Sequence, residues 1–468
     1  MQNFQAYSYI VLDYSIRYVV YSPESKAMGF LRKTISWQGN AQVRRYYLMG
    51  LPFFTKKKGE SQTCWLFGVR LFSRKRRRKH SSLSMADRVA FAMVLKKEIC
   101  TKERIVLWID HSLGGGTEVY SLNHFREVKE TMCVIRFQYF PGLRVFRLSL
   151  PTSTVGQFVS FDSLDEAFNF VTESAPLDEL VVNNLVGYPN SLAVLEQVIR
   201  IKNELLPRLR VSFRGHDFQS VCPSFNLLNS EMYFCNLSHP LGCENCLRSV
   251  HLGRNEEEDT ILMSGAASLA SWRSVWGRFF DATLDEFIAF SEEIARIFFR
   301  VYPQLEGKTR VVPHRVPPLR KVRVPAHSGI NIGILGNISL IQKGRLIVDR
   351  ICKLLPSYPD VRLVILGDYL SQEKCAQLRV LGHYKRDELP SLVEKERVDV
   401  VLIPSIWPET FSYTTAEAMS MDLPVACFAL GAPYERVRRY PRGLILDSME
   451  GDLLLKQIIQ FVQNMRKE

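Results

Sequence analysis

The chain has 468 residues, of which 46% are apolar, so it is too long for one hydrophobic core and we expect two or three domains. No run of 18 apolar residues occurs, and the first residues lack a charged start followed by an apolar stretch. We therefore expect neither a membrane-spanning helix nor secretion. Ten cysteines scattered through such a chain indicate reduced thiols.

The positive charge is concentrated at the N-terminus. Residues 1–100 contain 19 Lys and Arg against 5 Asp and Glu, whereas the other 368 residues contain 42 against 43 and the whole chain carries +13. An aromatic, apolar unit that ends in a basic run occurs twice, in residues 47–58 and 65–76. We expect a small hairpin within residues 1–80 that binds an anionic membrane surface. A solvated basic linker and a nucleic-acid-binding segment are the alternatives, and no nucleic-acid-binding motif supports the latter.

An α/β domain is predicted for residues 101–314, after a helix from Ser84 to about Ile99. Arg104–Asp110 is typical of a buried strand, and Gly114, Gly115 and Gly116 lie between it and the next helix. Glycines at this place allow the backbone to approach a phosphate or a sugar closely. Further strands are predicted at residues 133–137, 180–182, 209–213, 287–290 and 311–314, with helices at 164–171, 191–205 and 291–302.

His216 follows the strand predicted at residues 209–213, at the edge of the sheet where ligands bind. Four cysteines come next, inside an insertion of residues 216–250: Cys222, Cys235, Cys243 and Cys246. Four thiols in so short an excursion, ending in C-x2-C, are what a structural Zn²⁺ site requires. Buried thiols and disulfides are the alternatives.

A second Rossmann-like domain is predicted for residues 329–468, after a proline-rich basic linker at 315–328. Its first turn contains Gly336, Asn337 and Lys343, and a lysine there suits contact with a phosphate. Gly367 and Tyr384 follow at further strand ends. The remaining strands are predicted at residues 330–335, 361–366, 398–403, 424–428 and 443–446, with a short one before Gly382 and a final helix from 452 to about 465.

Residues 398–435 are the stretch on which the functional prediction rests. A buried strand ends in Pro-Ser, Ser412 is a plausible N-cap for the next helix, and two carboxylates mark the unit, Glu409 in the loop and Glu417 in the helix. Unpaired N–H groups at the helix start suit a diphosphate, and carboxylates beside them suit sugar hydroxyls.

The pair of glutamates, framed as PSxWPExFxxxxxEAM and followed by Pro-Val and Gly431, resembles the E-x7-E signature of the retaining glycosyltransferases of family 4. The resemblance implies an α/β GT-B fold, two Rossmann-like domains that face a cleft, and transfer of a hexosyl-type unit from a nucleotide sugar to a glycan or lipid-linked acceptor in surface-polysaccharide synthesis. It further implies catalytic roles for Glu409, His216 and Lys343, and donor binding by Gly115, Gly116, Gly336, Asn337, Lys343, Gly367, Tyr384, Phe411, Ser412 and Glu417.

Two positions depart from the family pattern. Asn337 lies where relatives often carry an Arg that assists the lysine, and Asn183 and Asn184 lie where some carry His. The chain has no Asp-x-Asp motif, so a metal bound to the donor diphosphate is not implied. We expect an enzyme in the cytoplasm, peripheral on the membrane face. A catalytically silent sugar-binding or scaffold protein of the same fold, and a basic nucleic-acid binder, remain the alternatives.

Overall fold

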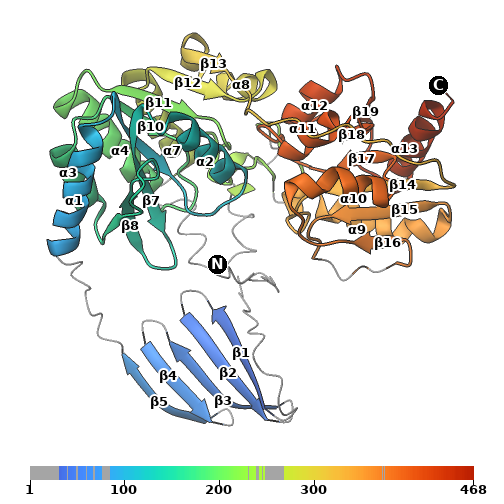
Figure 1. Cartoon of the computed structure of the whole chain (residues 1–468), viewed down its shortest axis with the longest axis horizontal. Coiled ribbons are helices and arrows are strands. Elements are labelled where there is room, and N and C mark those ends of the chain that lie inside the picture. The colour runs from blue at the N-terminus through green and yellow to red at the C-terminus, as the bar shows by residue number, and fades with distance from the viewer. Residues whose placement is uncertain are drawn as a thin grey trace.

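The computed structural model describes residues 31–38, 41–48, 51–58, 61–66, 69–75, 85–229, 231–238, 242–244, 246–247, 268–370, 373 and 375–467. These residues form an N-terminal antiparallel sheet and two larger α/β units, which we call the N-domain and the C-domain (Figure 1). Both units have parallel sheets covered by helices and are Rossmann-like, as the sequence predicts.

The N-terminal sheet differs from the small hairpin expected from the repeat. Five strands follow one another in a meander, β1 (Leu31–Gln38), β2 (Ala41–Leu48), β3 (Leu51–Lys58), β4 (Ser61–Leu66) and β5 (Val69–Lys75). Each repeat unit starts at the end of one strand and continues into the next, and the pairing register shifts at the same place in both units, at Tyr46/Tyr47 and at Cys64/Trp65. Each repeat unit thus joins the end of one strand to the following strand. A lone hairpin is only marginally stable, so a stable sheet needs more strands than one hairpin supplies. The last basic residues, 76–79, lie outside the described residues.

The N-domain contains an eight-stranded sheet in the order β13-β12-β11-β10-β6-β7-β8-β9. Its strands are β6 (Arg104–Asp110), β7 (Met132–Phe140), β8 (Val145–Ser149), β9 (Phe158–Phe161), β10 (Glu179–Val182), β11 (Arg210–Arg214), β12 (Glu286–Ala289) and β13 (Thr309–Val311). Its helices are α1 (Met85–Ile99), α2 (Gly116–Val128), α3 (Leu164–Ser174), α4 (Ser191–Arg200), η1 (Ile201–Leu205), α7 (Leu269–Ala282), α8 (Glu292–Phe299) and η2 (Pro303–Lys308). The sequence does not predict β8 and β9, which are short; at the edge of the sheet β8 pairs antiparallel with β7, and β9 pairs antiparallel with β8.

The two faces of this sheet have separate cores. Ile105, Leu107 and Ile109 point to the larger core, whereas Val106 and Trp108 pack against Phe125 of α2 on the other face. Because successive side chains of a strand alternate between faces, β6 is buried on both sides and reads as a continuous apolar run.

The C-domain sheet has six parallel strands in the order β16-β15-β14-β17-β18-β19. Its elements are β14 (Ile330–Leu335), η3 (Ile341–Lys343), α9 (Arg345–Leu354), η4 (Leu355–Ser357), β15 (Val361–Leu366), β16 (Leu378–Val380), η5 (Arg386–Glu388), α10 (Leu389–Lys395), β17 (Val400–Ile403), α11 (Tyr413–Ser420), β18 (Val425–Phe428), α12 (Gly431–Val437), β19 (Gly443–Leu446) and α13 (Gly451–Met465). Numbered from β14, this is the Rossmann order 3-2-1-4-5-6, and the strand order reverses between β14 and β17. Ligands of such sheets bind at that reversal, outside the carboxyl ends of the strands.

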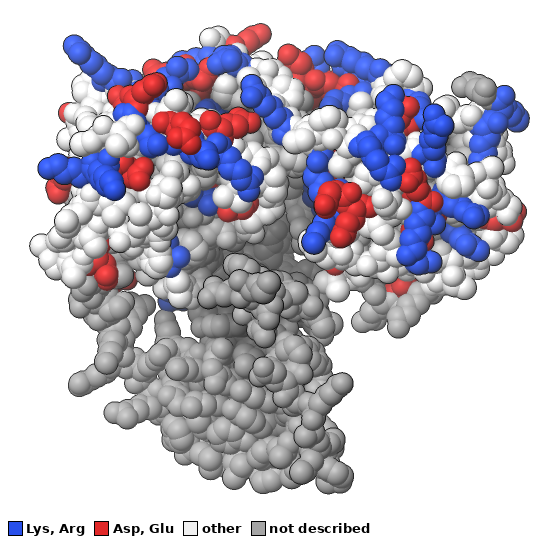
Figure 2. All heavy atoms as spheres, viewed as in Figure 1, with Lys and Arg blue, Asp and Glu red and all other residues white. Residues whose placement is uncertain are grey.

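The two domains meet through α8 and α12, where the backbone N–H of Glu293 donates to Glu435 Oε2 at 2.9 Å. On the face in Figure 2, basic and acidic side chains are interspersed over both domains, and the charge of residues 101–468 is nearly balanced. None of the described helices combines the length and apolarity needed to cross a bilayer.

Candidate active site

Glu409 lies in the loop that leaves β17, and its side chain is only 5% exposed. Lys343 Nζ lies 2.8 Å from its Oε1 atom, and the Ser405 hydroxyl donates to the same oxygen. Burial raises the pKa of the Glu409 carboxyl, but the charge and hydrogen bond of Lys343 and the hydroxyl donors outweigh burial, so the pKa lies below its usual value. Glu409 is therefore ionised at neutral pH although it is buried.

Lys343 reaches Glu409 because the turn before α9 lies against the loop after β17. Gly344 has φ of 94°, and a Cβ atom there would lie 2.0 Å from the carbonyl oxygen of Pro404. Only glycine allows this approach. The Lys343 side chain is 36% exposed, so its ammonium also has donors free for an anionic ligand.

Glu417 pairs with a residue that the sequence does not single out. Arg386 Nε donates to Glu417 Oε1 at 2.8 Å, and Arg386 Nη2 donates to the backbone oxygen of Pro317. Burial raises the pKa of the Glu417 carboxyl, and Arg386 offsets this only in part. Burial and the nearby Glu417 raise the pKa of the Tyr384 phenol, which lies in the same corner. No sequence motif marks Arg386, because only tertiary packing brings its side chain to Glu417.

The ends of β14 and β15 meet at two predicted glycines. Gly367 has φ of 146°, and a Cβ atom there would lie 1.9 Å from the Gly336 oxygen; Gly336 itself lies close to Thr414 at the start of α11. Asn337 is exposed, and its Oδ1 atom accepts the Ser339 N–H at 2.9 Å. Its side chain therefore caps its own turn and brings no positive charge to the site.

The glycine loop of the N-domain approaches the same helix start. Gly114 and Gly115 both have positive φ, 81° and 80°, and α2 begins at Gly116. A Cβ atom at Gly116 would lie 3.4 Å from the Tyr413 ring. The loop therefore lies beside the first residue of α11, although no sequence motif links the two segments.

A buried hydrogen-bond network positions His216. Arg136 and Ser121 both donate to Asp110 Oδ2, and Asn183 Nδ2 donates to Asp110 Oδ1 at 3.0 Å. The Asn183 amide oxygen then faces His216 Nε2 at 3.0 Å, so Nε2 carries the proton and donates. Burial and the neighbouring His314, His111 and Arg214 lower the pKa of His216 well below its usual value. His216 is thus a neutral imidazole whose Nδ1 is an acceptor.

Asn184 also has a structural partner. Its Nδ2 atom donates to Asp217 Oδ2 at 2.7 Å, and its Oδ1 atom accepts the Val186 N–H. Burial raises the pKa of Asp217 to about 6. Both asparagines therefore organise the loop that carries His216, which is a role the sequence does not reveal.

The two domains join at this site. The Thr410 hydroxyl donates to the His216 backbone oxygen at 2.9 Å, and His314 Nδ1 lies 3.0 Å from the Tyr413 hydroxyl. The rings of His314 and Phe411 stack with centroids 4.3 Å apart. The loop with Glu409 and the loop with His216 are therefore neighbours.

Arg436, another residue that the sequence does not mark, fixes the loop before α11. Its Nη2 atom donates to the backbone oxygens of Phe411 and Ser412, and its guanidinium lies over the Phe411 ring at 4.6 Å from the centroid. Burial lowers the pKa of Arg436 to about 10. Ser412 precedes α11 as predicted, but with φ of 66° and no side-chain cap, so Arg436 rather than a serine cap orders this turn.

The zinc prediction is not supported by the geometry. Among the residues that the structure describes, no group of three or more His, Cys, Asp or Glu side chains is placed to hold a metal ion. Cys222, Cys235, Cys243 and Cys246 are half-buried and line one narrow cavity of about 20 Å³. Burial raises the pKa of Cys222 to about 11 and also raises that of Cys235. The raised pKa values of Cys222 and Cys235 favour protonated thiols at these two positions, in agreement with the thiol alternative that the sequence left open.

Comparison with known protein families gives a match to the C-terminal part of this chain. The family model for Glycosyl transferases group 1 matches residues 341–468. This segment contains Lys343, Glu409 and Glu417, and with the two Rossmann-like domains the match supports a glycosyltransferase of GT-B fold.

Similar solved structures include Anabaena Alr3699/HepE in complex with UDP-glucose, with 15% identity, coverage of 78% of this chain and 91% of that chain, and a TM-score of 0.48. A glycosyltransferase from Rickettsia africae has 13% identity, 78% and 89% coverage and a TM-score of 0.47. The catalytic domain of starch synthase IV from Arabidopsis thaliana, bound to ADP and acarbose, has 11% identity, 78% and 93% coverage and a TM-score of 0.46. These similarities are too distant to transfer a function. A comparison with curated protein sequences found no significant match.

Proposed function

We propose that the protein is a retaining glycosyltransferase that transfers a hexosyl unit from a nucleotide sugar to a glycan or lipid-linked acceptor in cell-surface polysaccharide synthesis, with the E-x7-E residues of family 4. The observation that carries the proposal is the junction of the Lys343–Glu409 pair with the His216 loop, through the hydrogen bond from Thr410 to His216. Charged groups from one domain and a neutral imidazole from the other meet at the edge where Rossmann-like sheets bind nucleotides.

The donor diphosphate would lie between Lys343 and the start of α11. Lys343 has free N–H donors, and the first turn of α11 presents unpaired backbone N–H groups. Both stabilise the negative charge that grows on the leaving diphosphate as the glycosidic bond breaks. The glycine loop of the N-domain reaches the same helix start, since a Cβ atom at Gly116 would lie 3.4 Å from the Tyr413 ring.

The sugar and the ribose would be held by the carboxylates. Ionised Glu409 accepts hydrogen bonds from sugar hydroxyls, and His216 Nδ1 accepts one from the opposite side. Glu417 accepts from the ribose hydroxyls, which requires Arg386 to share or release the carboxylate that it now contacts. Tyr384, beside Glu417, forms a wall of the nucleotide pocket.

Residues 1–80 would bring the enzyme to the cytoplasmic face of an anionic membrane. The charge excess of the chain lies in this segment, and the repeated aromatic and basic units are strands of one antiparallel sheet. Basic residues that are clustered in one segment are attracted to anionic headgroups, with about 1 kcal/mol per charge near the surface.

A second candidate is a catalytically silent subunit of the same fold that binds sugars. Asn337 favours it, because this side chain caps its own turn where relatives often carry a cation. Such a subunit would bind a donor without releasing its nucleotide.

A panel of nucleotide sugars tests both candidates. We expect one of them to raise the melting temperature, since a ligand at 100 times its Kd adds about 2.7 kcal/mol to stability. We then expect slow release of free nucleotide, with the liberated sugar retaining its anomeric configuration. Binding without release would select the silent subunit, and absence of binding across the panel would contradict both.

A further inference from the structure

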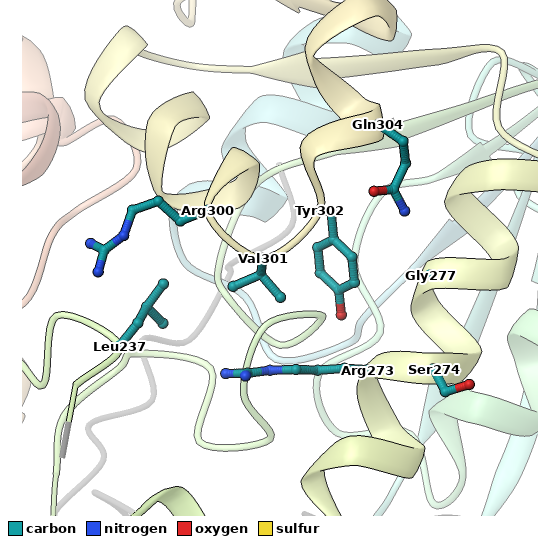
Figure 3. Close-up of a pocket in the computed structure, with 8 residues that line it drawn as sticks. All are labelled: Leu237, Arg273, Ser274, Gly277, Arg300, Val301, Tyr302 and Gln304. Carbon is teal, nitrogen blue, oxygen red and sulfur yellow. The ribbon is translucent and has the colours of Figure 1, made fainter. Parts of the chain in front are cut away.

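A second cavity lies in the N-domain, between α7, the end of α8 and the loop around Leu237 (Figure 3). Its volume is about 550 Å³, and eight residues line it: Leu237, Arg273, Ser274, Gly277, Arg300, Val301, Tyr302 and Gln304. None of the residues that line it belongs to the candidate active site. The cavity therefore needs its own explanation.

The charge of this cavity is positive. Arg273 and Arg300 line it, and none of its described lining residues is a carboxylate. Arg273 Nε donates to the Val221 backbone oxygen at 2.9 Å, and the described residues give its two Nη atoms no acceptor. The Nη atoms of Arg300 donate to the side-chain and backbone oxygens of Asn236.

Neutral oxygens thus hold both guanidinium groups in place without cancelling their charge. Arg136, in contrast, is neutralised by Asp110 and Glu118 in the same domain. Fixed guanidinium groups with free N–H donors match the paired oxygens of a phosphate or a carboxylate.

The other side of the cavity is uncharged. Figure 3 shows the two guanidinium groups on one side, with the Ser274 hydroxyl and the Gln304 amide on the other. Tyr302 lies between them, but it is only 3% exposed and its hydroxyl is bonded to the Ser220 oxygen at 2.6 Å, so it forms a closed part of the wall. Gly277 leaves the wall of α7 open.

We propose that this cavity binds a sugar that carries a phosphate or a carboxylate. The arginines would take the oxyanion, Ser274 and Gln304 would bond hydroxyls, and Leu237 and Val301 would contact the apolar face of the sugar. The volume is in the range of small-molecule sites. Ser220 and Val221, which anchor Tyr302 and Arg273, follow His216 by only a few residues. Since the N-domain is the acceptor side in the proposed function, the class of ligand is an anionic acceptor glycan, and this last step rests on that function.

Calorimetric titration of the full chain with glucose 6-phosphate, glucuronate and glucose, in a buffer without phosphate, tests the site. At least one of the two anionic sugars should bind, glucose should bind at least tenfold more weakly, and the stronger ligand identifies the oxyanion. Failure of both anionic sugars to bind, or equal binding of glucose, would overturn the proposal.

Matched variants locate the binding. Arg300→Gln should weaken it at least tenfold, whereas Arg278→Gln, one residue past Gly277 on α7 and paired with Glu196, should not change it. Gly277→Leu should fill the cavity and abolish binding, but Gly277→Ala should preserve it, since its Cβ would approach only Tyr302, at 4.0 Å. Equal affinities in all four variants would place the ligand elsewhere.

A further variant tests whether the anionic sugar binds in the donor cleft instead of this cavity. Lys343→Ala should leave binding of the anionic sugar unchanged, because Lys343 does not line this cavity. If no nucleotide sugar binds but the anionic sugar does, the proposed function fails and the anionic site stands. A loss of sugar binding in Lys343→Ala would instead assign the sugar to the donor cleft and overturn the site.

Discussion

The hydroxyl of Thr410 donates a hydrogen bond of 2.9 Å to the backbone oxygen of His216, across 194 positions of the chain. Thr410 directly follows Glu409, so this bond holds the loop of the acidic signature against the histidine loop of the other domain. It is the contact by which two segments with separate sequence patterns become one site.

Glu417→Ala should weaken binding of the donor by roughly ten- to a hundredfold, because a lost charge-assisted hydrogen bond costs about 1.5 to 3 kcal/mol. The fold should survive, since Arg386 retains the Pro317 oxygen as a partner. Titration with the best nucleotide sugar measures the effect. Glu394→Ala, which removes a half-buried α10 carboxylate that pairs with Arg320 of the linker, is the control. Equal donor affinities in the two variants would contradict the assignment of Glu417.

Gly344→Ala should destabilise the protein far more than Gly382→Ala. Both glycines have positive φ, 94° and 75°, so both substitutions carry the backbone cost of about 1–2 kcal/mol. Only at Gly344 would the new methyl also meet Pro404, 2.0 Å from its oxygen, whereas nothing lies within 4 Å at Gly382. Denaturant unfolding compares the variants, and similar losses would mean that the Lys343 turn does not pack against the β17 loop.

Stability should fall as the pH drops below about 6.5. Burial lowers the pKa of His124 to about 4 and that of His314 to about 3, so the unfolded chain takes up these protons at higher pH than the folded chain. Stability is then complete above pH 6.5 and decreases by up to about 1.4 kcal/mol per pH unit for each histidine until the folded pKa is reached.

His124→Phe should remove the contribution of one proton to the slope of stability against pH. The fold should tolerate the change, because His124 stacks on Trp108 with ring centroids 4.9 Å apart and a phenyl ring can take its place. Urea unfolding at pH 5 and at pH 7 measures the slope. The substitution His383→Phe at an exposed position is the control. An unchanged slope in His124→Phe would show that this imidazole is already solvated in the folded protein.

The thiols should differ in reactivity. Cys100 is exposed and should be alkylated first at pH 7.5, whereas burial raises the pKa of Cys133, Cys352 and Cys427 to about 12 and that of Cys222 to about 11. Thiolate is the reactive form, so these four should react slowly until the protein is unfolded. Mass spectrometry after timed alkylation measures the order.

Protein purified without an affinity-tag metal should contain no stoichiometric zinc, and one zinc per chain would contradict the buried-thiol interpretation.

The N-terminal sheet should carry membrane binding. Residues 56–58 and 74–79 contain nine positive charges, each contributing about 1 kcal/mol near an anionic surface. Their replacement by Gln should release the chain from anionic vesicles at low salt. Co-sedimentation at 0.1 M and 1 M salt should show weaker binding of the native chain at high salt, because the Debye length falls from about 10 Å to 3 Å. Equal sedimentation of native and neutralised chains would leave this segment as a solvated linker.

The sequence by itself determined the order of the parallel strands and of the helices between them in the two Rossmann-like domains, although not the antiparallel strands β8 and β9. Apolar runs such as Val400–Ile403 and Ile330–Leu335, bounded by glycine and proline, are local signals, and burial on both faces of a parallel sheet requires them. The positions of Gly336, Glu409 and Glu417 are local in the same sense, because a strand end or a helix start places them.

Only the tertiary structure decided which of these groups meet. Arg386 reaches Glu417 across 31 positions and Asn183 reaches His216 across 33, and no periodicity encodes such pairs. The repeat at the N-terminus likewise could not reveal a five-stranded sheet, since strand pairing depends on partners outside each unit. The spacing of the four cysteines suggested zinc, but spacing along the chain does not determine how side chains converge: the four line one cavity, and no group of three or more ligands among the described residues is placed to hold a metal ion.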